Sequence, residues 1–154
     1  MLVDNLKIVQ GKIQAALQTR KEAKLTGDNV TLVAVTKNHA PEVITEALAL
    51  GVECIGENRV QEAKHKKEVL PAGGKWHLIG HLQTNKVKYI IDKVSMIHSL
   101  DRISLAKEID RQAAKHGKVM NVLCEVNIGA EESKSGLAPE DVIPFLEEIS
   151  TFDH

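Results

Sequence analysis

Short apolar runs alternate with amphipathic segments along most of the chain. The apolar runs lie near residues 31–36, 53–55, 76–79, 94–98 and 119–126. Helical patterns precede, separate and follow them, and the clearest lie at residues 4–25, 41–50, 57–70, 101–116 and 139–150. Runs of Val and Ile of strand length between helical patterns are typical of parallel βαβ units. The pattern therefore predicts an α/β fold with a leading helix and five such units.

The spacing of glycines selects among α/β folds. No G-x-G-x-x-G or P-loop sequence follows any predicted strand, so a dinucleotide-binding doubly wound fold loses support. A TIM-type (β/α) barrel is the better prediction. A complete eight-stranded barrel needs about 200 residues or more, whereas 154 residues supply five strands. We therefore predict a single domain over residues 1–154 that forms the N-terminal part of a barrel. Its first and fifth strands would be open edges, through which self-association is expected.

Composition and charge exclude several classes of protein. The formal net charge of −1 argues against a polyanion-binding protein, so no nucleic-acid partner is expected, and the run 64–67 is interpreted as a solvated helix face. No signal-peptide pattern or apolar run of membrane-spanning length occurs, which predicts a soluble, cytoplasmic protein without a membrane partner. Cys54 and Cys124 lie in apolar runs, and the histidines lack metal-ligand spacing, so no disulfide framework or metal site is expected.

Polar side chains follow each of the five predicted strands. In order along the chain they are Lys37, Glu57 and Asn58, His81, His98 and Ser99, and Asn127. In barrels of this type, chemistry takes place at the carboxyl ends of the strands. Polar groups that converge on one rim therefore favour a functional site there.

Lys37 is the strongest candidate among these residues. A lysine at the mouth of a sheet, partly desolvated, has its ammonium form disfavoured, and a neutral amine can attack a carbonyl to form a Schiff base. Each candidate also has a plainer interpretation. Lys37 is then a surface lysine, Asn58 a cap of the following helix, and His81 a donor to a loop carbonyl.

Five motifs in register resemble the pyridoxal-phosphate homeostasis protein family. They are Leu-Val-Ala-Val-Thr-Lys at 32–37, Gly-Glu-Asn-Arg-Val-Gln-Glu at 56–62, Trp-His-Leu-Ile-Gly-His-Leu-Gln-Thr-Asn-Lys at 76–86, His-Ser-Leu-Asp-Arg at 98–102, and the stretch 126–136. The resemblance covers nearly the whole chain and corresponds to the N-terminal two-thirds of the family. It implies the fold-type III barrel, related to the N-terminal domain of alanine racemase.

The resemblance also implies a cofactor and its residues. Family members bind pyridoxal 5'-phosphate as an aldimine on the lysine that ends the first strand, here Lys37, with Asn58 and His81 beside the ring. Lys134 resembles a family lysine in a loop near the pocket, although an exposed loop charge is the plainer interpretation. The family's phosphate-binding elements lie in its last third, beyond this sequence, so cofactor retention by this chain stays open.

Three functions are compatible with these sequence features and with the resemblance. The first is a non-catalytic carrier that acts in vitamin B6 and amino-acid homeostasis and releases cofactor to amines or to other pyridoxal-phosphate-dependent apoenzymes. The second is an enzyme, either an amino-acid racemase, which needs a second acid/base opposite the lysine, or a Schiff-base aldolase, which needs carboxylates at the rim. The only tyrosine, Tyr89, falls within a predicted helix away from the rim, and Glu57 is the only strand-end carboxylate. The third is a ligand-free fragment. We expect the carrier, with no catalytic residues.

Overall fold

A computed structural model of the chain describes residues 1–20, 29–70 and 72–154. The helices are α1 (Leu2–Thr19), α2 (Pro41–Ala49), α3 (Val60–Val69), α4 (Val87–Ile90), α5 (Ile103–Lys115) and α6 (Val142–Ile149). The strands are β1 (Val33–Val35), β2 (Cys54–Glu57), β3 (Lys75–Leu78), β4 (Met96–Leu100) and β5 (Asn121–Cys124). Short 3₁₀ turns, Thr84–Lys86 and Pro139–Asp141, precede α4 and α6. The predicted leading helix and five βα units are therefore confirmed.

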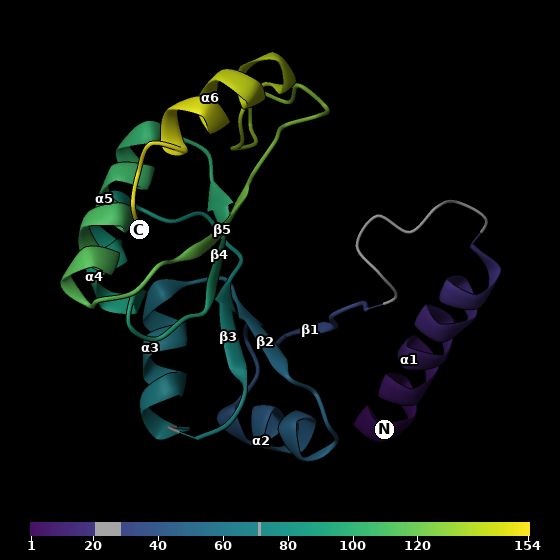
Figure 1. Cartoon of the computed structure of the whole chain (residues 1–154). Helices are drawn as coiled ribbons and strands as arrows, with labels where there is room; N and C mark the ends of the chain where they lie inside the picture. Colours follow the sequence, from purple (N-terminus) through teal and green to yellow (C-terminus); the bar gives the residue numbers. More distant parts are fainter. Residues whose placement is uncertain (21–28, 71) are drawn as a thin grey trace.

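The five strands form one parallel sheet in the order β1-β2-β3-β4-β5. Each strand pairs with the next strand in sequence, and the order never reverses as it does in a doubly wound sheet. Sequential parallel pairing of this kind is the arrangement of a (β/α) barrel wall. Figure 1 shows α3, α4 and α5 on one side of the sheet, with α1 beyond β1. In the described residues, β1 and β5 are the two edges of this sheet, as predicted.

The register across the strands separates two faces of the sheet. Residues paired across parallel strands project to the same face, and neighbours in sequence alternate. Ile55 and Trp76 form one row, and Leu78 and Ile97 belong to the next row on the same face. All four are at most 2 % exposed, and they pack beneath the helices. The opposite face carries the exposed Val35 and the half-buried Met96 and His98, together with the buried Cys54 and His77.

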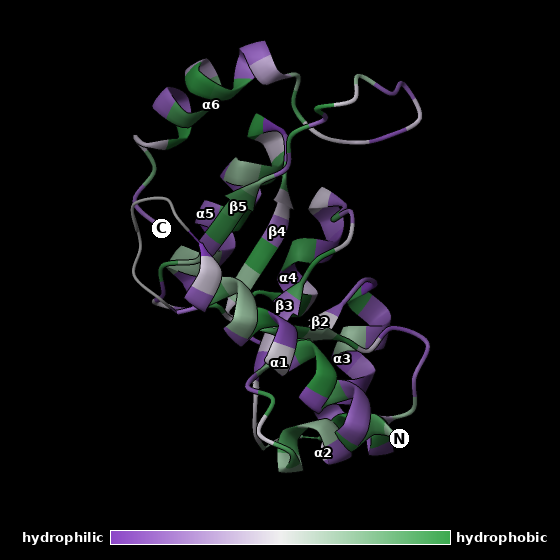
Figure 2. Ribbon diagram, turned by 90° about the vertical axis from the view of Figure 1, so that its right-hand side faces the viewer, coloured by the Kyte–Doolittle hydropathy of each residue, from purple (hydrophilic) through white to green (hydrophobic). Residues whose placement is uncertain are grey.

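Helix boundaries follow local sequence signals. Proline occupies the first turn of α2, and Gly51 with φ +93° follows its end, as the fixed φ of proline and the freedom of glycine favour. Pro144 lies in the first turn of α6, where its missing N–H costs no hydrogen bond. Figure 2 shows the alternation of apolar and polar residues around these helices.

Two predicted boundaries involve residues outside the described part of the chain. The leading helix was expected over 4–25, and α1 is described over Leu2–Thr19. Arg20 is extended and ends α1 before the predicted limit, and residues 21–25 lie outside the described part of the chain. The helix expected over 57–70 is described over Val60–Val69, and residue 71 is not described. Downstream, the chain returns to the sheet, because Met120 donates its backbone N–H to the His154 carbonyl at 2.7 Å.

Candidate functional site

The structure places Lys37, Asn58 and His81 together at the carboxyl ends of the strands. They follow β1, β2 and β3, which are neighbouring parallel strands. The backbone ladder continues beyond the strands, because Thr36 N–H donates to the Gly56 carbonyl at 3.0 Å and Ile79 N–H donates to the Glu57 carbonyl at 2.9 Å. The three side chains therefore project from adjacent strand ends. Lys37 and His81 are exposed, and Asn58 is half-buried.

Asn58 and Gly80 lie in close contact at this rim. A methyl group built on Gly80 would lie 2.2 Å from the Asn58 carbonyl oxygen and 2.5 Å from Asn58 Oδ1. Only a residue without Cβ permits this approach, so Gly80 sets the position of the Asn58 amide beside the start of the His81 loop. Asn58 is not a helix cap, because α3 begins after Arg59 and has no side-chain cap hydrogen bond. The plainer interpretation of Asn58 is therefore wrong.

A buried charged network fixes the backbone on both sides of Lys37. Lys66 Nζ, on α3, donates to the Thr36 carbonyl at 2.7 Å, to Glu57 Oε1 at 2.8 Å and to Glu62 Oε1 at 2.8 Å. These bonds use all three donors of the ammonium group. Glu62 Oε1 also accepts the Asn38 N–H at 2.7 Å. The carbonyl before Lys37 and the amide after it are thus both tied to α3.

Two further details show how tightly this network is packed. Thr36 Oγ1 donates to Glu57 Oε1 at 2.5 Å, and both residues are buried. Asn38 has φ +65°, a left-handed conformation that asparagine adopts more readily than most residues. A turn held in this way places the Lys37 side chain at the end of β1 without relying on a contact of the side chain itself.

Charge pairing shifts two pKa values in the network in opposite directions. The hydrogen bond from Lys66, helped by the Asn38 N–H, lowers the pKa of Glu62 below its ordinary value. Burial alone would lower the pKa of Lys66, but its hydrogen bonds to Glu57 and Glu62 outweigh burial and raise the pKa. Both shifts favour the charged forms, so the network is an ion pair over a wide pH range.

This network corrects one sequence interpretation and identifies residues that sequence reasoning missed. The run 64–67 was interpreted as a solvated helix face, but Lys66 is 4 % exposed. Glu62 and Lys66 stand four residues apart, the spacing of an ion pair along one helix face, and that spacing is the signal that points to the pair. Nothing in the sequence indicates that the pair lies against Thr36 and Glu57.

Lys37 itself differs from expectation in one respect. Partial desolvation of its amine was expected, whereas the side chain is exposed in the structure. The reason is the alternation of side chains along the chain: Thr36 is buried against Glu57, and its neighbours Val35 and Lys37 project the other way and are exposed. The amine is open to solution at the rim.

Arg102 supports the His81 loop from the next strand. Its guanidinium donates to the Leu82 carbonyl and, at 2.7 Å, to Asp101 Oδ1. Neither Asp101 nor Ser99 caps α5, which begins after Arg102 and has no side-chain cap hydrogen bond. The Ser99 hydroxyl is buried and has no hydrogen-bond partner in the part of the chain that the structure describes. Asp101 accepts the hydrogen bond from Arg102.

The fourth and fifth strands contribute less to the rim than expected. His98 lies within β4, and its Nε2 lies 2.9 Å from Nδ1 of His77 on β3. Burial lowers the pKa of both histidines, and the neighbouring charges of His98 and Lys75 lower that of His77 further. Asn127 holds its own loop, with Nδ2 donating to the Glu131 carbonyl at 2.7 Å. Polar strand ends therefore converge fully only at the first three strands.

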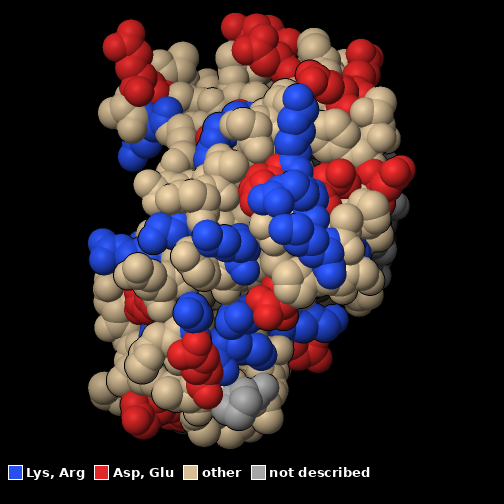
Figure 3. Space-filling view, turned by 90° about the vertical axis from the view of Figure 1, so that its left-hand side faces the viewer, with Lys and Arg blue, Asp and Glu red and all other residues tan. Residues whose placement is uncertain are grey.

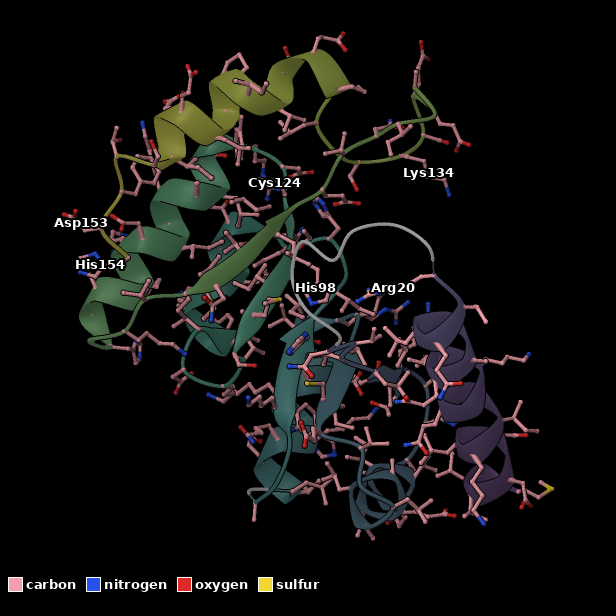
Figure 4. The ribbon with its side chains drawn as sticks, turned by 45° about the vertical axis from the view of Figure 1, so that its right-hand side comes forward. Arg20, His98, Cys124, Lys134, Asp153 and His154 are labelled. Atoms are coloured by element: carbon pink, nitrogen blue, oxygen red, sulfur yellow. The ribbon has the colours of Figure 1, made fainter. Side chains whose placement is uncertain are left out.

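Lys134 lies in the loop between β5 and α6. It is exposed, and Figure 4 shows it at the tip of that loop, away from the sheet. A cavity of about 680 Å³ lies between α1 and residues that precede β1 and β2, including Thr31 and Glu53. That is the opposite end of the strands from Lys37.

The described residues contain no group of three metal-ligating side chains and no helix long and apolar enough to cross a membrane.

Comparison with known proteins gives one family-model match and several relatives. The model described as "Alanine racemase, N-terminal domain" matches residues 11–154. A protein of Aquifex aeolicus named pyridoxal phosphate homeostasis protein is 45 % identical over 138 residues, which are 88 % of this chain and 60 % of the relative. A Haemophilus influenzae protein of the same name is 34 % identical over 153 residues, 97 % of this chain and 63 % of the relative. The chain thus spans about three-fifths of the length of the curated relatives it matches.

Two solved structures are also similar to this chain. PipY of Synechococcus elongatus, in a structure with pyridoxal phosphate bound, superposes with a TM-score of 0.74 at 33 % identity, over 92 % of this chain and 64 % of PipY. Alanine racemase of Clostridium difficile superposes with a TM-score of 0.72 at 15 % identity, over 97 % of this chain and 37 % of the racemase. The first is similar in sequence and fold, and the second shares the fold. The predicted barrel class and family resemblance are confirmed.

Proposed function

The chain belongs to the alanine racemase N-terminal domain family, and on that premise we propose that it acts as a pyridoxal phosphate homeostasis protein and holds the cofactor as a Schiff base on Lys37. The observation that carries this proposal is the anchoring of the backbone on both sides of an exposed lysine. Lys66 binds the Thr36 carbonyl, and Glu62 binds the Asn38 amide. A lysine on the protein surface needs no such buried support.

The residues at the rim fit the aldehyde end of the cofactor. Pyridoxal phosphate supplies an aldehyde that condenses with a primary amine, and the amine of Lys37 is open to solution. Asn58 and His81 present an amide and an imidazole from the two neighbouring strand ends, where each can donate a hydrogen bond to the ring. We assign them this positioning role. The phosphate group is not assigned to any described residue.

The proposal includes the absence of catalytic turnover. A racemase needs a second acid/base on the opposite side of the α-carbon from the lysine. The single tyrosine of the chain, Tyr89, lies on α4 with 40 % of its surface exposed, away from the strand ends that carry Lys37. His81 follows β3 and projects from the same end of the parallel strands as Lys37. This arrangement supports holding and release of the cofactor over racemisation.

The exposure of Lys37 also supports release of the cofactor. An amine that enters the open rim can compete with Lys37 for the aldehyde, so cofactor can pass to free amino acids or to the lysine of an apoenzyme. We propose pyridoxal-phosphate-dependent apoenzymes as recipients. The names of the curated relatives support a homeostatic role of this kind.

Reductive trapping tests the covalent assignment. The protein is mixed with pyridoxal phosphate and borohydride, which reduces the carbon–nitrogen double bond, and the modified lysine is located by peptide mass spectrometry. We expect modification concentrated at Lys37 and a several-fold lower total yield for Lys37→Ala. Lys134→Ala serves as the matched control, because it removes an exposed loop lysine and should leave the yield unchanged.

Three results would contradict the proposal. One is modification spread evenly over exposed lysines, and another is an unchanged yield in a Lys37→Ala protein that is folded by circular dichroism. The third concerns turnover: formation of D-alanine from L-alanine above the rate with cofactor alone would show a racemase.

A further inference from the structure

Three lysine side chains surround one exposed aromatic ring on the outer surface of α3 and α4. The Nζ atoms of Lys64, Lys86 and Lys88 lie 5.5, 6.0 and 5.1 Å from the centroid of the Tyr89 ring. Each distance is within the range of a cation–π interaction. Tyr89 is 40 % exposed, so the ring stays available to a partner. Beside this group, Lys67 Nζ lies 5.4 Å from the Trp76 ring. We call these residues (Lys64, Lys67, Lys86, Lys88 and Tyr89) the Tyr89 patch.

The patch has almost no carboxylate of its own. Glu68 lies 4.0 Å from Lys64, at the limit of an ion pair. Within the described parts of the chain, Lys67, Lys86 and Lys88 form no salt bridge. Ammonium groups this close repel one another over the Debye length of about 10 Å at 0.1 M salt. A polyanionic partner would relieve that repulsion.

The patch belongs to a wider separation of charge along the chain. Residues 59–93 hold eight Lys and Arg and three Asp and Glu, a net charge of +5, although the whole chain carries −1. Residues 131–153 hold seven Asp and Glu and one Lys, a net charge of −6. Figure 3 shows Lys and Arg gathered over the middle of this face and Asp and Glu toward the end where α6 lies. Charge of one sign is therefore concentrated at the patch.

We propose that the Tyr89 patch is a docking surface for an acidic segment of a partner protein. Lysines supply attraction and faster association, and an exposed tyrosine at their centre supplies the kind of anchor that dominates protein interfaces. A nucleic acid fits less well, because the whole chain carries a net charge of −1 and offers little attraction to an extended phosphate backbone, whereas a short acidic segment needs the patch alone. This surface lies outside the residues assigned to the cofactor, so the proposal is independent of the proposed function.

The single tyrosine gives a specific test. Protein labelled only at tyrosine shows one set of ring signals in NMR, and these report on the centre of the patch. The probe is a glutamate-rich peptide with one central leucine. We expect the Tyr89 ring signals to shift on titration, and binding to weaken as salt is raised. The double variant Lys64→Glu/Lys88→Glu should bind the peptide at least about tenfold more weakly. The control Lys7→Glu/Lys12→Glu has the same change in net charge on exposed α1 positions, and its affinity should change less than about twofold.

Several outcomes would overturn the proposal. Equal weakening in the two double variants would show attraction to net charge rather than to the patch. Tighter binding of a single-stranded oligonucleotide than of the peptide would show a nucleic-acid surface. A concentration-dependent dimer that Lys64→Glu/Lys88→Glu abolishes would show that the patch binds residues 131–153 of a second copy.

Discussion

Lys66 Nζ lies 2.8 Å from Glu57 Oε1, and the two side chains are only 4 % and 1 % exposed. This ion pair joins α3 to the end of β2 beneath the turn that presents Lys37. Glu57 Oε2 is buried without a hydrogen-bond partner among the described residues, where Lys66 and Thr36 carry the compensation for burying this carboxylate. A charge held in this way depends strongly on each remaining partner.

Removal of Lys66 should therefore be costly. Lys66→Met keeps most of the apolar volume but leaves Glu57 buried without its cation. We expect the free energy of unfolding to fall by about 3–5 kcal/mol, the usual cost of breaking one side of a buried pair. Urea unfolding followed by circular dichroism measures it. Lys7→Met, which makes the same substitution at an exposed position on α1, should change it by less than about 0.5 kcal/mol.

A second variant distinguishes the charge from packing. Adding Glu57→Gln to Lys66→Met removes the unpaired charge, so the double variant should be more stable than Lys66→Met alone. If the free energy of unfolding of the double variant is lower than that of wild type by the sum of the losses in the two single variants, the pair is not coupled. This account of the network is then wrong.

The pairing of Glu62 predicts a dependence on pH. Its pKa is lowered in the folded protein by Lys66, so its contribution to stability is complete above the unfolded-state pKa, about 4.3, and is lost as pH falls through the lowered folded-state pKa. Wild type should be more stable than Glu62→Gln at pH 7, and the difference should shrink steadily in acid. Unfolding midpoints from pH 7 down to the acid limit of folding measure this. A difference that is constant over that range would contradict the prediction.

The sequence predicts the order of elements well because each element carries its own local signal. Apolar runs and their spacing identify the strands, and Pro41 and Gly51 bound α2. Sequential parallel pairing follows, since βαβ units of this length pair with their neighbours. The strand ends at Lys37, Asn58 and His81 are predictable for the same reason.

What the sequence did not predict depends on contacts between elements. Lys66 stands in a basic run that has the composition of a solvated face, and only the packing of α3 on β2 turns it inward to Glu57. His98 was predicted at a strand end, but β4 continues to Leu100 and pairs it with His77. The exposure of Lys37 depends on whether Thr36 or Lys37 faces Glu57, and periodicity does not indicate that.

The contact between Gly80 and Asn58 gives a third prediction. An alanine at position 80 would place its methyl 2.2 Å from a backbone oxygen, which no rotamer change relieves. The end of β2 must then move, and we expect a loss of about 1–3 kcal/mol in unfolding free energy. Because the Asn58 amide moves as well, the yield of pyridoxal phosphate trapped on Lys37 should also fall.

Gly11→Ala is the matched control for this substitution. Gly11 lies within α1, and a methyl group there meets no atom within 4 Å. Alanine at a helical site of this kind should raise stability by about 0.5–1 kcal/mol. If Gly80→Ala also stabilises the protein or leaves it unchanged, the rim is not as closely packed as the structure shows.

The His77–His98 pair predicts a loss of stability in a different pH range. Burial lowers the folded-state pKa of both rings, so the unfolded chain binds protons first as pH falls below about 6.5, the ordinary value for histidine. The contribution to stability is therefore complete above that pH and declines as pH falls through the lowered folded-state pKa values. His98→Gln should reduce the decline between pH 7 and pH 5, measured by thermal unfolding, whereas His65→Gln, at an exposed position on α3, should not. If both variants follow the wild-type profile, the His77–His98 pair does not govern stability in this range.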